Sequence, residues 1–241
     1  ESQLRDDRNV LELLTADYTF LNERLAQHYG ITGVYGNHFR PVSFNDGLRG
    51  GLLGQGSILT ATSYPNRTSP TLRGKWVLDN LLGAPSPPPP PDVPDLEDSD
   101  ALSPRSVRER LEAHRTNPVC ASCHSRMDPF GLALEPFDAI GGLRLHDAGE
   151  LIDASAQLPD GTSLEGPGGV REYLLGNEER FVATLTKKLL IYALGRGLED
   201  YDPPAVRRIV RAAAADDYSW SSLVIGIVES VPFQMRRSQQ Q

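Results

Sequence analysis

The chain has 241 residues, of which 39% are hydrophobic and 23% are charged. This length and composition allow a sizeable core in one large or two modest domains, and they argue against a disordered chain. The net charge of −8 argues against nucleic acid and anionic membrane surfaces as partners. No apolar run approaches the roughly 20 residues of a transmembrane helix, so we expect no membrane-spanning segment in this chain.

Residues 1–83 are predicted to form a helical segment. Apolar residues recur at helical spacing over residues 10–29, and Gly30 follows them as a helix-ending glycine. A Gly-rich polar stretch comes next. A further helix is predicted over residues 73–82, where Gly83 ends it.

Residues 84–100 are predicted to be a linker. Prolines 87–91 are uninterrupted, and such a run adopts an extended polyproline II conformation that offers no donors to a sheet. We interpret it as a strap laid over the protein surface. An acidic stretch then ends the linker, and a helix over residues 105–114 opens the last region, residues 101–241.

The stretch Cys120-Ala-Ser-Cys-His124 matches C-x-x-C-H, the attachment signature of a c-type haem. Two thiols three residues apart on a helical turn can each add to one vinyl group of a haem. The imidazole that follows is then held under the ring as the proximal ligand of the iron. We therefore expect one covalent haem c, bound through Cys120 and Cys123, with His124 on the iron.

Three other uses of these two cysteines, the only ones in the chain, remain open. A redox pair is typical of a thioredoxin-like βαβ context, but no Val/Ile-rich strand precedes Cys120. A zinc site needs four ligands, usually from a second Cys/His pair, and the sequence offers no such pair. A disulfide between residues this close closes too small a loop to stabilise the chain much.

The sixth iron ligand is predicted to be Met235, which follows the last predicted helix just after a proline. Distal methionines of small c-type cytochromes stand well downstream of the attachment signature. Met127 lies one helical turn beyond His124, so its side chain stays on the proximal side of the ring. The alternatives are His146 or His114 as the ligand, or a Met235 that merely fills a gap in the core.

Further groups are candidates for contact with the haem or its proximal imidazole. The carbonyl of Pro136 or Pro129 is a candidate acceptor for the ring N–H of that imidazole, which would fix the ring and raise its basicity. The guanidinium groups of Arg126, Arg144 and Arg196 match the geometry of haem propionates. Each arginine is also compatible with an ordinary solvated surface charge.

The rest of the chain is predicted to be helical with one small hairpin. Asp160-Gly161 is a turn signal flanked by apolar positions, and it predicts a β-hairpin within residues 150–164. Helical spacing of apolar residues predicts helices over residues 170–175, 181–194, 206–214 and 221–229. The predicted fold class is therefore mainly α: a helical N-terminal segment, a Pro-rich strap, and a haem domain with a small hairpin.

Several longer stretches carry a resemblance to a known family: Leu14–Leu25, Arg67–Leu78, the proline run, Cys120–Gly131, Phe137–Gly141, Leu158–Gly161, Tyr192–Leu198 and Pro232–Arg237. They resemble the large planctomycete-type cytochrome c-like proteins, which are built from domains of unknown function numbered 1592, 1588 and 1585. The resemblance implies an exported haem protein with a cytochrome c-like domain over residues 101–241. It also implies that residues 1 to about 55 are the tail of a larger first domain.

The function predicted from these features is electron transfer by an exported bacterial c-type cytochrome. Covalent haem is attached outside the cytoplasm in bacteria, so we expect a periplasmic or other extracytoplasmic location. The expected partners are redox proteins with a basic face, and the chain is expected to be a module or subunit of a larger redox assembly. The alternatives are a peroxidase-like haem enzyme with an open distal site and a structural subunit of an electron-transfer complex.

Overall fold

The structure, a computed structural model, describes residues 1–44, 47–87 and 106–235. Helices account for about 51% of these residues and strands for 11%, which confirms the predicted mainly α class. The strands form small antiparallel pairs. Most of the predicted proline linker lies outside the described residues.

The chain divides into two compact units, each assembled from separate stretches of sequence. Unit 1 comprises Glu1–Leu13, Asn80–Gly83 and the chain from Leu174 onward, and unit 2 comprises Leu14–Asp79 and Ala84–Tyr173. The division expected from sequence, with borders at 83 and 100, remains a prediction.

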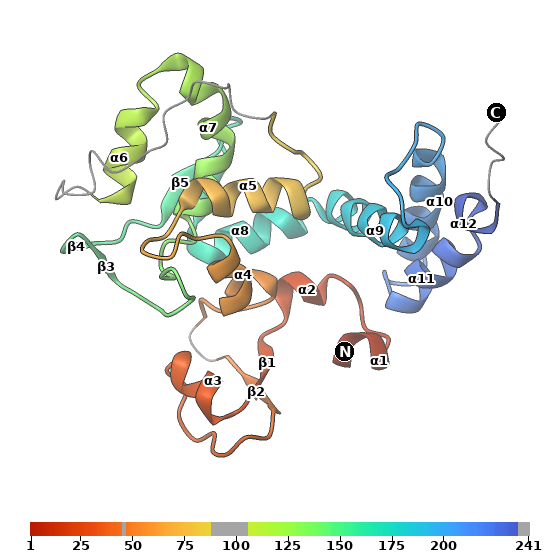
Figure 1. Ribbon diagram of the computed structural model, residues 1–241, viewed down its shortest axis with the longest axis horizontal. Helices are drawn as coiled ribbons and strands as arrows, with labels where there is room; N and C mark the ends of the chain where they lie inside the picture. The colour runs from red at the N-terminus through yellow and green to blue at the C-terminus, as the bar shows by residue number, and fades with distance from the viewer. Residues whose placement is uncertain (45–46, 88–105, 236–241) are drawn as a thin grey trace. The chain divides into compact units, whose positions relative to one another are not determined.

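Unit 1 is helical in its described residues, and α9, α10 and α11 pack together in it (Figure 1). Its helices are α1 (Ser2–Arg5), α9 (Glu178–Leu194), α10 (Pro203–Ala214), α11 (Trp220–Val228) and α12 (Val231–Gln234). One face of α10 buries Val206, Ile209, Val210 and Ala213, the spacing of an amphipathic helix. The three helices predicted over 181–194, 206–214 and 221–229 are confirmed to within a few residues.

The first residues of the chain join the last helices of unit 1 through backbone hydrogen bonds. The N–H of Val10 donates to the carbonyl of Tyr218 at 2.9 Å, and the N–H of Trp220 donates to that of Arg8 at 3.2 Å. Asn9 and Ser219 form an isolated antiparallel bridge between these bonds. Residues about 200 positions apart thus form one piece of unit 1.

The single helix predicted over residues 10–29 is wrong. The segment forms α2 (Glu12–Thr15), β1 (Tyr18–Leu21) and α3 (Glu23–His28), and β1 pairs antiparallel with β2 (Arg40–Ser43). The aromatic and β-branched residues of β1 favour a strand. The side chain of Asn22 then accepts from the N–H of Leu25 and starts α3 as a new helix. Gly30 ends α3 with φ +70°, as predicted.

Unit 2 holds the remaining helices, and those around the C-x-x-C-H motif begin or end at capping residues. The helices are η1 (Leu52–Gly54), α4 (Gly56–Ala61), α5 (Pro70–Asn80), α6 (Val107–His114), α7 (Pro118–Leu132) and α8 (Gly166–Leu175); the last residue of α5 and the last two of α8 are assigned to unit 1. Ser106 and Glu109 form a capping box at the start of α6. The predicted helices over 73–82, 105–114 and 170–175 are confirmed with shifted ends.

Two hairpins, not one, occupy the region where the sequence predicts a hairpin. Their strands are β3 (His146–Asp147) with β4 (Glu150–Leu151), and β5 (Ser155–Gln157) with β6 (Ser163–Glu165). The predicted turn is correct, since the N–H of Gly161 donates to the carbonyl of Leu158 at 2.9 Å and Gly161 has φ +89°. Residues 150–151 pair backward with β3 because a left-handed Ala148-Gly149 turn precedes them.

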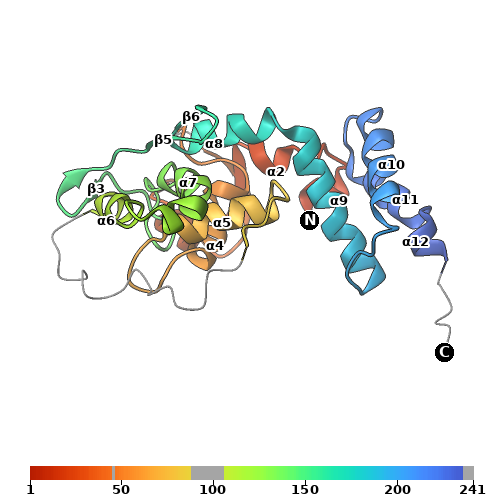
Figure 2. The same cartoon turned by 90° about the horizontal axis from the view of Figure 1, so that it is seen from above.

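Helices α5 and α7 cross with their backbones in direct contact (Figures 1 and 2). A Cβ atom added to Gly74 of α5 would overlap the carbonyl oxygen of Met127 in α7. A Cβ atom added to Gly131 of α7 would overlap the carbonyl oxygen of Pro70 in α5. Because both clashes involve backbone atoms, neither helix can accept a side chain at its crossing position without moving.

We predict that Gly131→Ala lowers the free energy of unfolding by about 3 kcal/mol, because the added methyl group forces α5 and α7 apart. Urea denaturation followed by circular dichroism measures this change. The control is Gly168→Ala in α8, where the nearest atom to an added Cβ is a guanidinium nitrogen of Arg171 at 4.0 Å. A Gly131 variant no less stable than the Gly168 variant would contradict the crossing.

Candidate haem-binding site

The C-x-x-C-H motif lies in the first two turns of α7. Asn117 caps this helix, its side chain accepting from the N–H of Val119 at 3.0 Å, and Pro118 occupies the first turn, where a missing N–H costs nothing. Cys120 and Cys123 are free thiols, both half-buried. Their spacing of three residues in a helix places both thiols on one face of α7.

The imidazole of His124 has a buried carboxylate as its partner. Nδ1 of His124 lies 3.1 Å from Oδ1 and 3.2 Å from Oδ2 of Asp128, one turn further along α7. Asp128 is 0% exposed, and its Oδ1 also accepts from the hydroxyl of Thr71 in α5 at 2.9 Å. Nε of Arg115 lies 3.9 Å from its Oδ2. Sequence reasoning missed Asp128, although its i+4 spacing from His124 was visible.

Of the other candidate ligands in unit 2, one packs against His124. The rings of His114 and His124 meet edge to face, with centroids 4.8 Å apart. Burial lowers the pKa of His114, and the nearby charge of His124 lowers it further. His146 lies exposed in β3, and Met127 is buried in α7.

Met235 lies in unit 1, at the C-terminal end of α12, and is 70% exposed. Its backbone N–H donates to the carbonyl of Val231 at 2.9 Å, which completes the last turn of that helix. His124 belongs to unit 2. Ligation of the iron by Met235 therefore stays a prediction.

The predicted backbone acceptors and two of the predicted propionate partners are also located. The carbonyl of Pro136 accepts from the N–H of Arg144 at 2.9 Å, and that of Pro129, within α7, accepts from Ala133 at 3.1 Å. Arg126 is exposed on α7. Arg196, in unit 1, is bound to the carboxylate of Asp202 at 2.7 Å.

Arg144, the third predicted propionate partner, lies in a network of buried charges. Its Nη2 donates to the carboxylate of Glu135 and to the hydroxyl of Thr68 at 3.1 Å, and its Nη1 donates to Asp147 at 3.3 Å. The Glu135 carboxylate also accepts from Thr68 at 2.9 Å and lies 3.4 Å from Nη1 of Arg73. Burial raises the pKa of Glu135, and the two guanidinium groups oppose that change.

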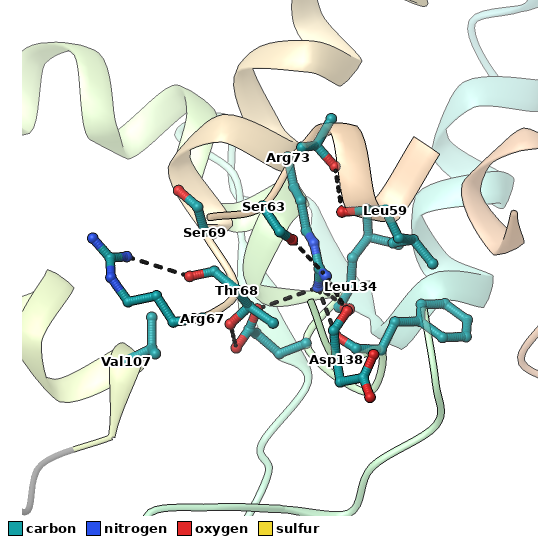
Figure 3. A network of polar contacts seen from close by, with 12 residues as sticks. Leu59, Ser63, Arg67, Thr68, Ser69, Arg73, Val107, Leu134 and Asp138 are labelled. Atoms are coloured by element: carbon teal, nitrogen blue, oxygen red, sulfur yellow. Dashed lines mark hydrogen bonds and ion pairs between the residues drawn. The ribbon is translucent and has the colours of Figure 1, made fainter. Parts of the chain in front are cut away.

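Arg73, from α5, holds the loop that follows α7 (Figure 3). Its Nη1 donates to the carbonyls of Leu134 at 2.9 Å and Phe137 at 2.8 Å, while its Nη2 donates to the carbonyl of Asp138 at 2.6 Å and the hydroxyl of Ser63 at 3.1 Å. Arg73 is 1% exposed, and this burial lowers its pKa to about 10. It therefore remains charged at neutral pH and needs the Glu135 carboxylate nearby.

We predict that Glu135→Gln lowers the free energy of unfolding by about 3–5 kcal/mol, because it removes the carboxylate paired with the buried guanidinium of Arg73 and leaves Arg144 with Asp147 alone. Chemical denaturation near neutral pH measures the loss. Glu150→Gln, at an exposed position of β4, is the matched control and should change stability by less than about 0.5 kcal/mol. Equal stability of the two variants would show that the charge of Glu135 is not needed to balance that of Arg73.

The residues of α7 fit the attachment of a haem. Two free thiols share one helical face, and the adjacent His124 makes its contact with Asp128 through Nδ1, which leaves Nε2 outside that contact. The zinc alternative gains no support, because in residues 1–44, 47–87 and 106–235 no three His, Cys, Asp or Glu side chains are arranged to hold a metal ion. Helix α6 precedes the motif, so the redox pair also lacks its preceding strand.

Three family models match the chain, and all three are described as proteins of unknown function. DUF1592 matches residues 1–31, DUF1588 matches residues 49–147, and DUF1585 matches residues 160–233. These are the three domains, in the same order, that the sequence motifs indicated. No curated protein and no solved structure matches the chain. Within the part of the chain that the structure describes, no helix is both long enough and apolar enough to cross a bilayer.

Proposed function

This chain carries the DUF1592, DUF1588 and DUF1585 domains of the planctomycete-type cytochrome c-like proteins, and from that premise we propose that it is an electron-carrying c-type cytochrome. One haem c is bound covalently through Cys120 and Cys123, and His124 binds its iron. The observation that carries the proposal is the pair of free thiols on one face of α7 beside an imidazole whose Nδ1 meets a carboxylate.

The chain's own residues supply attachment and orientation. When bound, the haem supplies a one-electron iron couple. The two thiols fix the ring against α7, and α7 itself is held against α5 by the contacts at Gly74 and Gly131. A site on a closely packed helix holds its side chains more precisely than one on a loop.

The protein acts outside the cytoplasm of a bacterium, where c-type haem is attached, and it exchanges electrons with another protein. Its net charge of −8 favours a partner with a basic face, since complementary charge speeds encounter. The three domain matches within one chain favour a module or subunit of a larger redox assembly over a free shuttle.

We predict that the chain, expressed in the periplasm of a host with haem-attachment machinery, is heavier than its polypeptide by one haem. Denaturing mass spectrometry measures this, because only a covalent group survives unfolding. The double variant Cys120→Ala, Cys123→Ala should have its plain polypeptide mass. A wild-type chain of unmodified mass would refute the proposed function.

The sixth ligand in this proposal is Met235. We predict that Met235→Ala abolishes the thioether-to-iron charge-transfer band of the oxidised protein, lowers the potential, and lets carbon monoxide bind the reduced form. Met127→Leu is the matched control, since Met127 is buried on the helix of the proximal ligand, and it should change none of these. Unchanged spectra in both variants would rule out methionine and make His146 the first alternative.

A haem enzyme with an open distal position is the second candidate function. The observation that favours it is that Met127, buried on α7, is the single methionine of unit 2. In that case carbon monoxide binds the reduced wild-type protein as readily as it binds Met235→Ala. Peroxide then reacts with the ferric protein, whereas an iron ligated by Met235 resists both reagents.

A further inference from the structure

The carboxylate beside His124 is the buried acid of α7 that neither the attachment of haem nor the Arg73 network uses. Asp128 is 0% exposed, yet it lies on the helix that carries the thiols and points both oxygens at Nδ1 of His124, at 3.1 Å and 3.2 Å. A buried carboxylate costs free energy unless its oxygens accept hydrogen bonds. The groups that contact Asp128 therefore indicate its role.

The carboxylate is held in place from a second helix. The hydroxyl of Thr71 in α5 donates to Oδ1 of Asp128 at 2.9 Å, and Nε of Arg115 lies 3.9 Å from Oδ2. Because α5 and α7 touch at Gly74 and Gly131, the position of Thr71 relative to Asp128 is set by backbone contact. The acid therefore cannot turn away from His124 without losing a hydrogen bond.

We propose that Asp128 is a positioning residue that fixes His124 as the Nδ1–H tautomer, turns Nε2 toward the iron, and lowers the haem potential. The part concerning the potential rests on the function proposed above, whereas the part concerning the tautomer does not. A carboxylate that accepts from the distant ring nitrogen raises the basicity of the ligating one. A more basic ligand stabilises the ferric state over the ferrous state.

This effect is opposite in sign to that of the sixth ligand. A methionine on the iron raises the potential relative to a second histidine, whereas Asp128 would lower it through its contact with His124. A backbone carbonyl, such as those of Pro136 or Pro129, would also orient the ring, but it carries no charge. A charged carboxylate in this position therefore affects the haem potential as well as the orientation of the His124 ring.

The first experiment uses the haem-free wild-type protein with its thiols reduced. Nitrogen-15 spectra of histidine-labelled protein at a pH of about 8, above the ordinary pKa of histidine, report which ring nitrogen carries the proton. His124 is assigned by the signals missing from His124→Gln. We expect the proton on Nδ1, the less common tautomer of a free histidine side chain. A proton on Nε2 overturns the inference.

The second experiment compares midpoint potentials of haem-loaded variants. Asp128→Asn keeps the shape but removes the charge, and we expect the reduced form to gain about tenfold at a given potential, an upward shift of about 59 mV. The control is Glu112→Gln on α6, which removes an exposed carboxylate paired with Arg108 at 3.8 Å. Its potential should match the wild type. An Asp128→Asn potential equal to that of Glu112→Gln overturns the effect on potential.

The outcomes separate this inference from the proposed function. A chain that carries no haem by mass refutes the function, and the tautomer of His124 in haem-free protein still decides the role of Asp128. A haem-loaded chain with an unshifted Asp128→Asn potential leaves the function standing and refutes Asp128 as its tuning group. The tautomer measurement uses wild-type protein, so it decides the part of the inference that concerns the tautomer even where Asp128→Asn fails to fold.

Discussion

The close crossing of α5 and α7 is the constraint on which the rest of unit 2 depends. Gly74 and Gly131 let the two backbones touch, and this short distance brings side chains of α5 within reach of α7 and its following loop. Thr71 then reaches Asp128, and two residues later Arg73 reaches the carbonyls of Leu134, Phe137 and Asp138. Helix α5 thus fixes, through Asp128, the orientation of the His124 ring, and it also binds the loop that follows α7.

The polar interior of unit 2 follows from the same crossing. Helix α7 ends in a tight loop whose carbonyls point inward, and such groups must find donors when they are buried. Arg73 provides several donors from one planar group, but its own charge then needs a countercharge. Glu135 provides it, shared with Arg144. The network is therefore a consequence of burying the loop carbonyls that follow α7. Its shared carboxylate, Glu135, also holds Arg144 in place.

Local signals were readable from sequence, and distant pairings were not. The C-x-x-C-H spacing, the helix predicted over residues 105–114 and the Asp160-Gly161 turn depend on neighbours in the chain, and the structure has helices α6 and α7 and the turn there. Strand β1 depends on β2, about 20 residues away, so its apolar spacing was mistaken for part of a helix. Asp128 was overlooked although its spacing of four residues from His124 was visible, because its burial and its hydrogen bond from Thr71, 57 residues earlier, are not readable from the sequence.

The backbone bonds that join residues 8–10 to residues 218–220 have a consequence for the order in which the chain can fold. Unit 1 includes both early and late stretches of sequence, so it cannot close until residue 220 has been synthesised. Unit 2 ends at residue 173, so all of its residues have been synthesised before residue 220 is. Domains fold as their sequences become complete, so the helix with the two thiols reaches its packed state while unit 1 is still open.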